Sequence, residues 1–144
     1  NGRRTVRCPL KEGKDLSYTI DFDRLEALAS DPKNTLLILC NPHNPVGRVW
    51  TRQELLMVSQ ICLRHHVFVI SDEIHCDLVF EGEHIPYFSL SEEAKQNSIT
   101  LTSGSKTYNI PAIPYAIAII PNPELRNGIR ISVTACSHRS ACWE

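Results

Sequence analysis

A lysine surrounded by small hydroxyl residues is the feature of this sequence that could most directly do covalent chemistry. Lys106 lies in the run Thr-Ser-Gly-Ser-Lys-Thr-Tyr-Asn, residues 102–109. A lysine amine becomes a nucleophile when a desolvated pocket or a neighbouring cation lowers its pKa, and it then forms an imine with an aldehyde such as pyridoxal phosphate. The hydroxyls of Ser103 and Ser105 and the backbone N–H of Gly104 could bind the phosphate of that cofactor. Taken alone, the pattern also fits a solvent-exposed loop lysine.

Two further polar segments each follow an apolar run directly. Residues 41–47 read Asn-Pro-His-Asn-Pro-Val-Gly, and residues 71–77 read Ser-Asp-Glu-Ile-His-Cys-Asp. The two Asn-Pro pairs exclude a helix and favour an ordered loop. Asn44, Asp72 and His75 are the candidate binding residues of these segments. Their ordinary alternatives are a turn-forming asparagine, a capping aspartate and a histidine hydrogen-bonded within the sheet.

The segment 71–77 also raises the possibility of a metal site formed by Asp72, Glu73, His75 and Asp77. Side chains alternate between the two faces of a strand, so Asp72 and His75 need not share a side with Asp77. We therefore expect no bound metal. A nucleotide-binding domain is also disfavoured, because neither a Gly-x-Gly-x-x-Gly turn nor a Walker loop follows any apolar run.

The apolar runs that precede the polar segments predict the strands that position them. Residues 36–40 and 67–71 are continuous apolar runs between turn signals, a pattern typical of strands buried on both faces of a parallel sheet. Residues 98–101 and 115–120 predict a third and a fourth strand. Ligands of such sheets bind beyond the carboxyl ends of the strands, so we expect the three polar segments to line one crevice.

Two helices are predicted before the second of these strands. Asp23 and Glu26 suggest an N-cap and its reciprocal partner for a helix that ends before Pro32. Thr51 and Glu54 form a capping box that opens an amphipathic helix, which completes a βαβ unit with the strands on either side. A short edge strand near residues 17–20 and a helix starting near residue 124 are also expected.

Composition narrows the class of protein. The 144 residues suit one domain, and the formal net charge of -1 gives no sign of a nucleic-acid or anionic-membrane binder. No apolar run approaches the length of a membrane span. The six cysteines form no Cys-x-x-Cys pair, which favours reduced thiols and a cytoplasmic location. We expect a small molecule as partner, with no nucleic acid and no membrane.

Taken in order and at these intervals, the three polar segments resemble the fold-type I pyridoxal-phosphate enzymes. Within the class I/II aminotransferase superfamily, the sequence is most similar to the cystathionine β-lyase-like carbon–sulfur lyases, because His75 stands where many aminotransferases have tyrosine. The likeness runs from about residue 18 to residue 126. It implies an α/β fold with a mostly parallel sheet, a partial three-layer sandwich that is the core of a pyridoxal-phosphate-dependent transferase large domain. Such enzymes are normally dimers.

The resemblance also implies a role for each matched residue. Lys106 matches the catalytic lysine that bonds the cofactor and moves the α-proton of the substrate. Asp72 matches the aspartate beneath the pyridine nitrogen, where a carboxylate keeps that nitrogen protonated and the ring able to accept electrons. Asn44 matches the asparagine that hydrogen-bonds the phenolic oxygen of the cofactor, and His75 lies where the superfamily has a second donor to that oxygen.

The phosphate site is matched less fully. Ser103 and Ser105 could hold the phosphate, with loop capping as the alternative. Ala112 stands where the family pattern has glycine, and Pro114 stands where many relatives carry a phosphate-binding arginine. These departures put the strength of phosphate binding in question.

The sequence does not begin with methionine, and we expect it to be part of a longer enzyme. Residues 1–127 would be a partial cofactor-binding large domain, and residues 128–144 a C-terminal tail that does not resemble the family's continuation. The parent would be a cytoplasmic homodimer that acts on cystathionine or cysteine S-conjugates by α-proton abstraction and β-elimination. Two alternatives stay open: a class I/II aminotransferase, and a truncated product without catalytic activity. Whether the chain itself is an enzyme also stays open.

Overall fold

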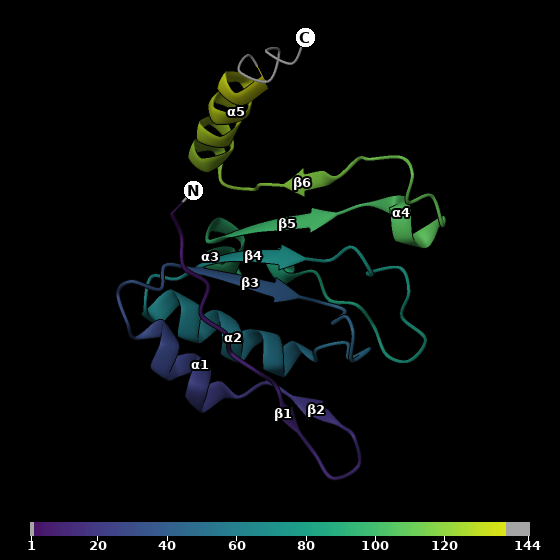
Figure 1. Cartoon of the computed structure of the whole chain (residues 1–144). Coiled ribbons are helices and arrows are strands. Elements are labelled where there is room, and N and C mark those ends of the chain that lie inside the picture. Colours follow the sequence, from purple (N-terminus) through teal and green to yellow (C-terminus); the bar gives the residue numbers. More distant parts are fainter. Residues whose placement is uncertain (1, 138–144) are drawn as a thin grey trace.

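A four-stranded, mostly parallel sheet carries the three polar segments (Figure 1). The computed structural model, which describes residues 2–137, orders the strands β3-β4-β5-β6. The strands β3 (Leu36–Cys40), β4 (Phe68–Asp72) and β5 (Ser98–Thr102) run parallel, and β6 (Ile117–Ile119) pairs antiparallel with β5. The prediction of an α/β fold with a mostly parallel sheet is confirmed.

The helix between β3 and β4 begins where the sequence predicts it. In α2 (Arg52–Arg64), the Thr51 hydroxyl accepts a hydrogen bond from the backbone N–H of Glu54 at 3.2 Å, and the Glu54 carboxylate accepts one from the backbone N–H of Thr51 at 2.8 Å. Glu54 also forms an ion pair of 2.7 Å with Arg48, which comes from the loop before the helix. The capping box therefore fixes the start of α2 and attaches the preceding loop to it.

One face of the sheet packs against the helices to form the core. Leu39 of β3 and Val69 of β4 belong to one buried apolar cluster together with residues of α2 and of α1 (Phe22–Ala29). Trp50 is 1% exposed, and its indole N–H donates to the backbone oxygen of Cys40 at 2.9 Å. Full burial of each large apolar side chain stabilises the fold by about 1.5–3 kcal/mol. The 3₁₀ turn η1 (Tyr87–Ser89) and the helix α3 (Glu92–Gln96) complete this side.

The opposite face of β3 is open, which corrects the prediction that residues 36–40 are buried on both faces. Leu36 is 38% exposed and Ile38 is 70% exposed. Successive residues of a strand point to opposite faces, and within residues 2–137 the helices that pack on β3 cover only the face of Leu39. An apolar run indicates a strand but does not reveal how many faces are covered.

The N-cap of α1 lies two residues earlier than predicted. Asp21, not Asp23, accepts a hydrogen bond from the backbone N–H of Arg24, at 3.1 Å. Glu26 does not reach back to the cap; its carboxylate pairs with Arg64 at 3.0 Å and with His65. The helix therefore starts at Phe22, and Glu26 connects α1 to the end of α2 instead.

The remaining elements lie at the two ends of the chain. A hairpin of β1 (Lys11–Glu12) and β2 (Tyr18–Thr19) includes the edge strand predicted near residues 17–20, and α5 (Pro123–Ser137) starts close to the predicted position. This helix runs through the expected boundary between residues 127 and 128, and residues 138–144 of the expected tail lie outside the described residues. That domain boundary stays a prediction.

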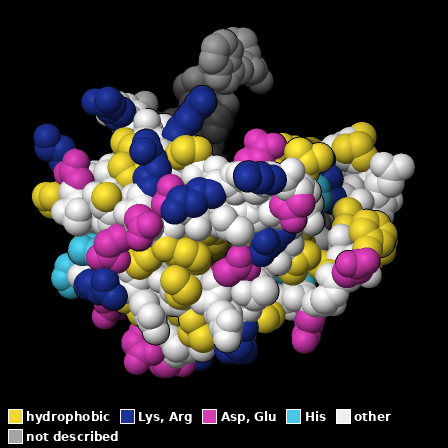
Figure 2. Space-filling model, turned by 90° about the horizontal axis from the view of Figure 1, so that it is seen from below, with side chains coloured by type: hydrophobic (Ala, Val, Ile, Leu, Met, Phe, Trp, Pro, Cys, Tyr) yellow, Lys and Arg dark blue, Asp and Glu magenta, His cyan; other side chains and the backbone are white. Residues whose placement is uncertain are grey.

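The surface and the helices agree with the small net charge. Figure 2 shows basic and acidic side chains interspersed over the face seen from below. No helix within the described residues combines the length and the apolar character needed to cross a membrane.

Candidate functional site

The carboxyl ends of the three parallel strands bring the three polar segments to one edge of the sheet. The arrowheads of β3, β4 and β5 point the same way in Figure 1, and α4 (Gly104–Thr107) follows β5 at that edge. The register places Cys40 beside Asp72 and Asp72 beside Leu101. Parallel pairing thus forces the segments after residues 40, 72 and 102 to start side by side.

Asp72 is the last residue of β4, and its side chain is half-buried. One carboxylate oxygen, Oδ1, accepts a hydrogen bond of 3.2 Å from the backbone N–H of Ile74. The other oxygen, Oδ2, has no hydrogen-bond partner among residues 2–137 and can accept a hydrogen bond from a ligand. Asp72 lies on the opposite face of β4 from Ser71 and Glu73, whose side chains are buried.

The loop after β3 is held by the buried side chain of Asn41. Its amide oxygen accepts from the backbone N–H of Trp50 at 3.2 Å, and its amide nitrogen donates to the backbone oxygen of Ile85 at 3.3 Å. Gly47 has φ +71°, a conformation that L side chains rarely adopt, so glycine is needed where this loop turns back. The side chain of Asn44, in the middle of this loop, is exposed and has no hydrogen-bond partner within residues 2–137.

Cys40 connects the strand β3 to this loop. Its thiol donates to the backbone oxygen of Pro42 at 3.2 Å and accepts from the backbone N–H of Asn44 at 3.5 Å. Burial raises the pKa of the Cys40 thiol, and the nearby negative charge of Asp72 raises it further. The thiol is therefore the uncharged form that can make both bonds at neutral pH.

Lys106 lies in the short helix α4, and its side chain is exposed. Within residues 2–137 its amine makes neither an ion pair nor a hydrogen bond. The N-cap of α4 is Ser103, whose hydroxyl accepts from the backbone N–H of Ser105 at 3.1 Å and donates to the backbone oxygen of Tyr115 at 2.9 Å. Ser103 thus has a structural role here, whereas the Ser105 hydroxyl has no partner in the described part of the chain.

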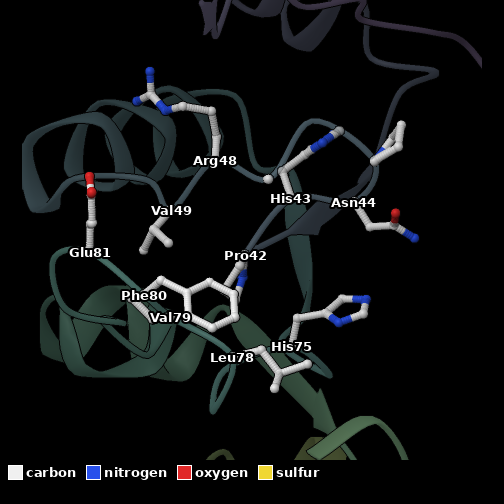
Figure 3. A pocket seen from close by; sticks show the side chains of 12 residues that line it. Pro42, His43, Asn44, Arg48, Val49, His75, Leu78, Val79, Phe80 and Glu81 are labelled. Carbon is white, nitrogen blue, oxygen red and sulfur yellow. The ribbon is translucent and has the colours of Figure 1, made fainter.

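A cavity of about 520 Å³ opens between the loop after β3 and the loop after β4 (Figure 3). Asn44 and His75 both line it, from opposite loops, together with Leu78, Val79 and Phe80. Lys106, Asp72, Ser103 and Ser105 do not line this cavity. The structure therefore brings two of the predicted site residues together in one cavity and places the other four at the same sheet edge, outside it.

Four residues at this edge make contacts that hold its loops and that the sequence pattern did not predict. They are Asn41, Arg48, Glu73 and His84. Arg48 is bound to Glu54, donates to the backbone oxygen of Tyr18 at 2.7 Å and lies 4.9 Å from the centre of the Trp50 ring. No motif points to His84, and Glu73 drew attention only as a possible metal ligand. Both carboxylate oxygens of Glu73 accept hydrogen bonds. No group of three or more His, Cys, Asp or Glu in residues 2–137 is arranged to hold a metal ion.

Comparison with known proteins identifies the family to which this fold belongs. The family model described as aminotransferase class I and II matches residues 1–141. Cystathionine beta-lyase PatB of Bacillus subtilis is 50% identical over 123 residues, which are 85% of this chain and 32% of that protein. The crystal structure of cystalysin from Treponema denticola, which contains a pyridoxal 5'-phosphate cofactor, superposes with a TM-score of 0.83 at 43% identity, over 87% of this chain and 32% of that one.

Transaminases are also similar. Kynurenine–oxoglutarate transaminase 3 of Rattus norvegicus is 33% identical over 124 residues, which are 83% of this chain and 27% of that protein. The chain thus spans about a third of the length of the relatives that it matches.

Proposed function

The chain belongs to the aminotransferase class I and II family, and we propose that the protein containing it is a pyridoxal-phosphate-dependent carbon–sulfur lyase. The observation that carries the proposal is the meeting of Lys106, Asp72 and Asn44 at one edge of a parallel sheet, each with a polar group that has no partner in the described residues. The similarity to cystathionine beta-lyase PatB supports the lyase branch.

The polar side chains at this edge match the chemical groups of pyridoxal phosphate. The cofactor supplies an aldehyde that bonds amines and a protonated ring that accepts electrons. The Lys106 amine would hold the aldehyde, and the free oxygen of Asp72 would accept the pyridinium N–H. The side chains of Asn44 and His75 would donate to the phenolic oxygen. The Ser105 hydroxyl is the available side-chain donor for the phosphate, because the Ser103 hydroxyl is already used.

These residues divide the work of β-elimination. The Lys106 amine takes the α-proton of the amino-acid substrate as a base. The electron pair of that C–H bond forms the Cα–Cβ double bond, the Cβ–S bond breaks, and the sulfur leaves with its electron pair and is protonated to a thiol. Water then releases the remaining carbon skeleton as pyruvate and ammonia. The negative charge of Asp72 would keep the ring nitrogen of the bound cofactor protonated, and a protonated ring is the electron acceptor that the reaction needs.

The substrate class is a sulfur-bearing amino acid such as cystathionine or a cysteine S-conjugate. The cavity beside Asn44 and His75 supports this choice, because Leu78, Val79 and Phe80 give it an apolar wall suited to a thioether. We further propose that the enzyme is a cytoplasmic homodimer with no nucleic-acid or membrane partner. The family resemblance supports the dimer, and the free thiols of Cys8, Cys40, Cys62 and Cys76 support a reducing compartment.

An aminotransferase is the second candidate, favoured by the similarity to kynurenine–oxoglutarate transaminase 3. The two activities share proton removal at the α-carbon and differ in the next step. A transaminase passes the amino group to an added keto acid and releases a keto acid that retains the substituent on Cβ.

The full-length protein incubated with cystathionine and pyridoxal phosphate distinguishes the two. We expect equal amounts of thiol, pyruvate and ammonia without any added keto acid. Exchange of amino groups that requires an added keto acid, with no thiol released, would show an aminotransferase instead. The 144-residue chain assayed alone tests the third possibility, a product without catalytic activity, and thiol release above that of free cofactor would exclude it.

A further inference from the structure

A buried carboxylate lies directly beneath the loops that carry the candidate site. Glu73 is 3% exposed and follows Asp72 at the end of β4. One of its oxygens, Oε1, accepts hydrogen bonds from the Ser71 hydroxyl and from the backbone N–H of Tyr87, both at 2.9 Å. The other, Oε2, lies 2.8 Å from Nε2 of His84. Three donors thus surround one buried carboxylate, and we call Glu73, Ser71, His84 and the Tyr87 N–H the Glu73 cluster.

The Glu73 cluster joins the two ends of the loop between β4 and η1. This loop, residues 74–86, starts immediately after Glu73, and His84 and Tyr87 lie at its far end. Several of its own side chains bury little surface: Leu78 is 40% exposed and Phe80 is 95% exposed. The position of the loop must therefore depend strongly on its polar contacts, at its two ends and at Asp77, because exposed apolar side chains contribute little to holding it.

The loop contacts three parts of the surroundings of the proposed site: the cavity, the helix α4 and the facing loop after β3. It contributes His75 and the apolar residues of one cavity wall, opposite Asn44. Its Asp77 accepts a hydrogen bond of 2.8 Å from the hydroxyl of Thr107, the residue after Lys106. The backbone oxygen of Ile85, near its end, accepts from the Asn41 side chain, which holds the facing loop.

From this arrangement we propose that Glu73 is a positioning residue for the cofactor and substrate site: it holds residues 74–86 closed, and through them it sets the places of His75 and of the helix that carries Lys106. The proposal rests on the proposed function for what the site binds. Glu73 touches neither ligand. Its carboxylate acts through the loop, since an unpaired donor in this buried position is costly and each of the three bonds therefore favours the closed loop.

The test uses the full-length protein with Glu73→Gln, which keeps the size of the side chain but removes its charge. Glu26→Gln is the matched control, because Glu26 also pairs with a histidine, His65, but does so between α1 and α2, away from the site. We expect Glu73→Gln to raise the dissociation constant of pyridoxal phosphate, measured by absorbance titration of the apoprotein, by about tenfold. Amide hydrogen exchange should become faster in residues 74–86 and stay unchanged in α2. The control should alter neither the dissociation constant nor the exchange of residues 74–86.

The outcomes separate positioning from general stability. Unchanged exchange in residues 74–86 together with an unchanged dissociation constant would overturn the proposal. Faster exchange across the whole sheet would overturn it as well, because that would show a loss of stability and not a loss of loop closure. If Glu73→Gln does not fold, His84→Gln, which weakens one of the three bonds, decides by the same two measurements. Wild-type protein that bound no pyridoxal phosphate would refute the proposed function, whereas the exchange result would still decide whether Glu73 holds the loop.

Discussion

The hydroxyl of Thr107 donates a hydrogen bond of 2.8 Å to Oδ2 of Asp77, a residue 30 positions earlier in the chain. This bond joins the loop after β4 to the short helix that follows β5. Lys106 is the neighbour of Thr107 in that helix, so the bond limits how far the lysine can move relative to Asp72 and His75. A four-residue helix has little stability of its own, and such outside contacts must fix its orientation.

Removing this bond should weaken cofactor retention without removing the lysine. We expect Asp77→Ala and Thr107→Val each to raise the dissociation constant of pyridoxal phosphate by roughly two- to fivefold, and the double variant to show no further loss, because both changes delete one bond. Absorbance titration of the full-length apoproteins measures this. Ser30→Ala, which deletes an exposed bond of 2.9 Å to the backbone oxygen of Ala27 at the end of α1, is the control. Additive losses in the double variant would contradict the pairing.

Lys106→Ala should abolish covalent attachment of the cofactor. The visible absorption band of the bound cofactor and the adduct trapped by borohydride should both disappear, because no other residue in this helix carries an amine. Lys95→Ala is the control, since Lys95 pairs with Glu92 on α3. A trapped adduct that persists in Lys106→Ala would place the attachment on a different lysine.

Asp72→Asn should lower the turnover of the full-length protein by about 100-fold or more, while the protein still folds. The amide is nearly the same size, and it can still accept the bond from Ile74 N–H, but it lacks the negative charge that stabilises a protonated ring nitrogen. Steady-state assays of thiol release measure the loss. Asp15→Asn in the exposed hairpin turn should leave the rate unchanged. A wild-type rate for Asp72→Asn would remove this aspartate from the reaction.

Thr51→Ala should destabilise the protein by about 1 kcal/mol, because it removes the side-chain acceptor for the backbone N–H of Glu54 at the start of α2. Urea unfolding measures the free energy of unfolding. Thr35→Ala is the matched control: Thr35 is exposed, and its hydroxyl makes no hydrogen bond in residues 2–137, so we expect a change within about 0.5 kcal/mol. Equal changes in the two variants would mean that the capping box contributes nothing measurable.

Alkylation of Cys40 should require an unusually high pH. Burial and the charge of Asp72 raise the pKa of this thiol above its ordinary value of 9.0, so the reactive thiolate is scarcer at every pH below that range. The rate of modification by iodoacetamide, followed by peptide mass spectrometry, should therefore rise with a midpoint above pH 9.0 in the folded protein. The same peptide in urea should show the ordinary midpoint. A folded midpoint below that of the unfolded peptide would contradict the assigned environment.

Local residue patterns predicted much of the fold. The run Leu36–Cys40 is a strand with the predicted bounds, and the Thr51–Glu54 box starts α2 as expected. These features succeed because strand propensity and helix capping depend on residues within a few positions of one another. The predicted N-cap of α1 was wrong by two residues, because Asp21 and Asp23 are equally good caps by type and only the backbone geometry chose between them.

The chemical groups at this sheet edge could be predicted from the sequence. A lysine after one predicted strand, an aspartate at the end of another and an asparagine after a third were all expected at the carboxyl edge, because parallel strands that share a sheet end at the same side. That these residues hold pyridoxal phosphate stays a prediction.

The contacts that hold these groups in place are apparent only in the folded chain. The bonds of Glu73 to His84 and Tyr87, of Asp77 to Thr107 and of Asn41 to Ile85 each join residues more than ten positions apart. Only the tertiary structure showed that Ile38 is exposed. Local patterns reflect the structure that a residue favours near its sequence neighbours. These contacts depend instead on how separate loops pack against one another, so they could not be predicted from local patterns in a single sequence.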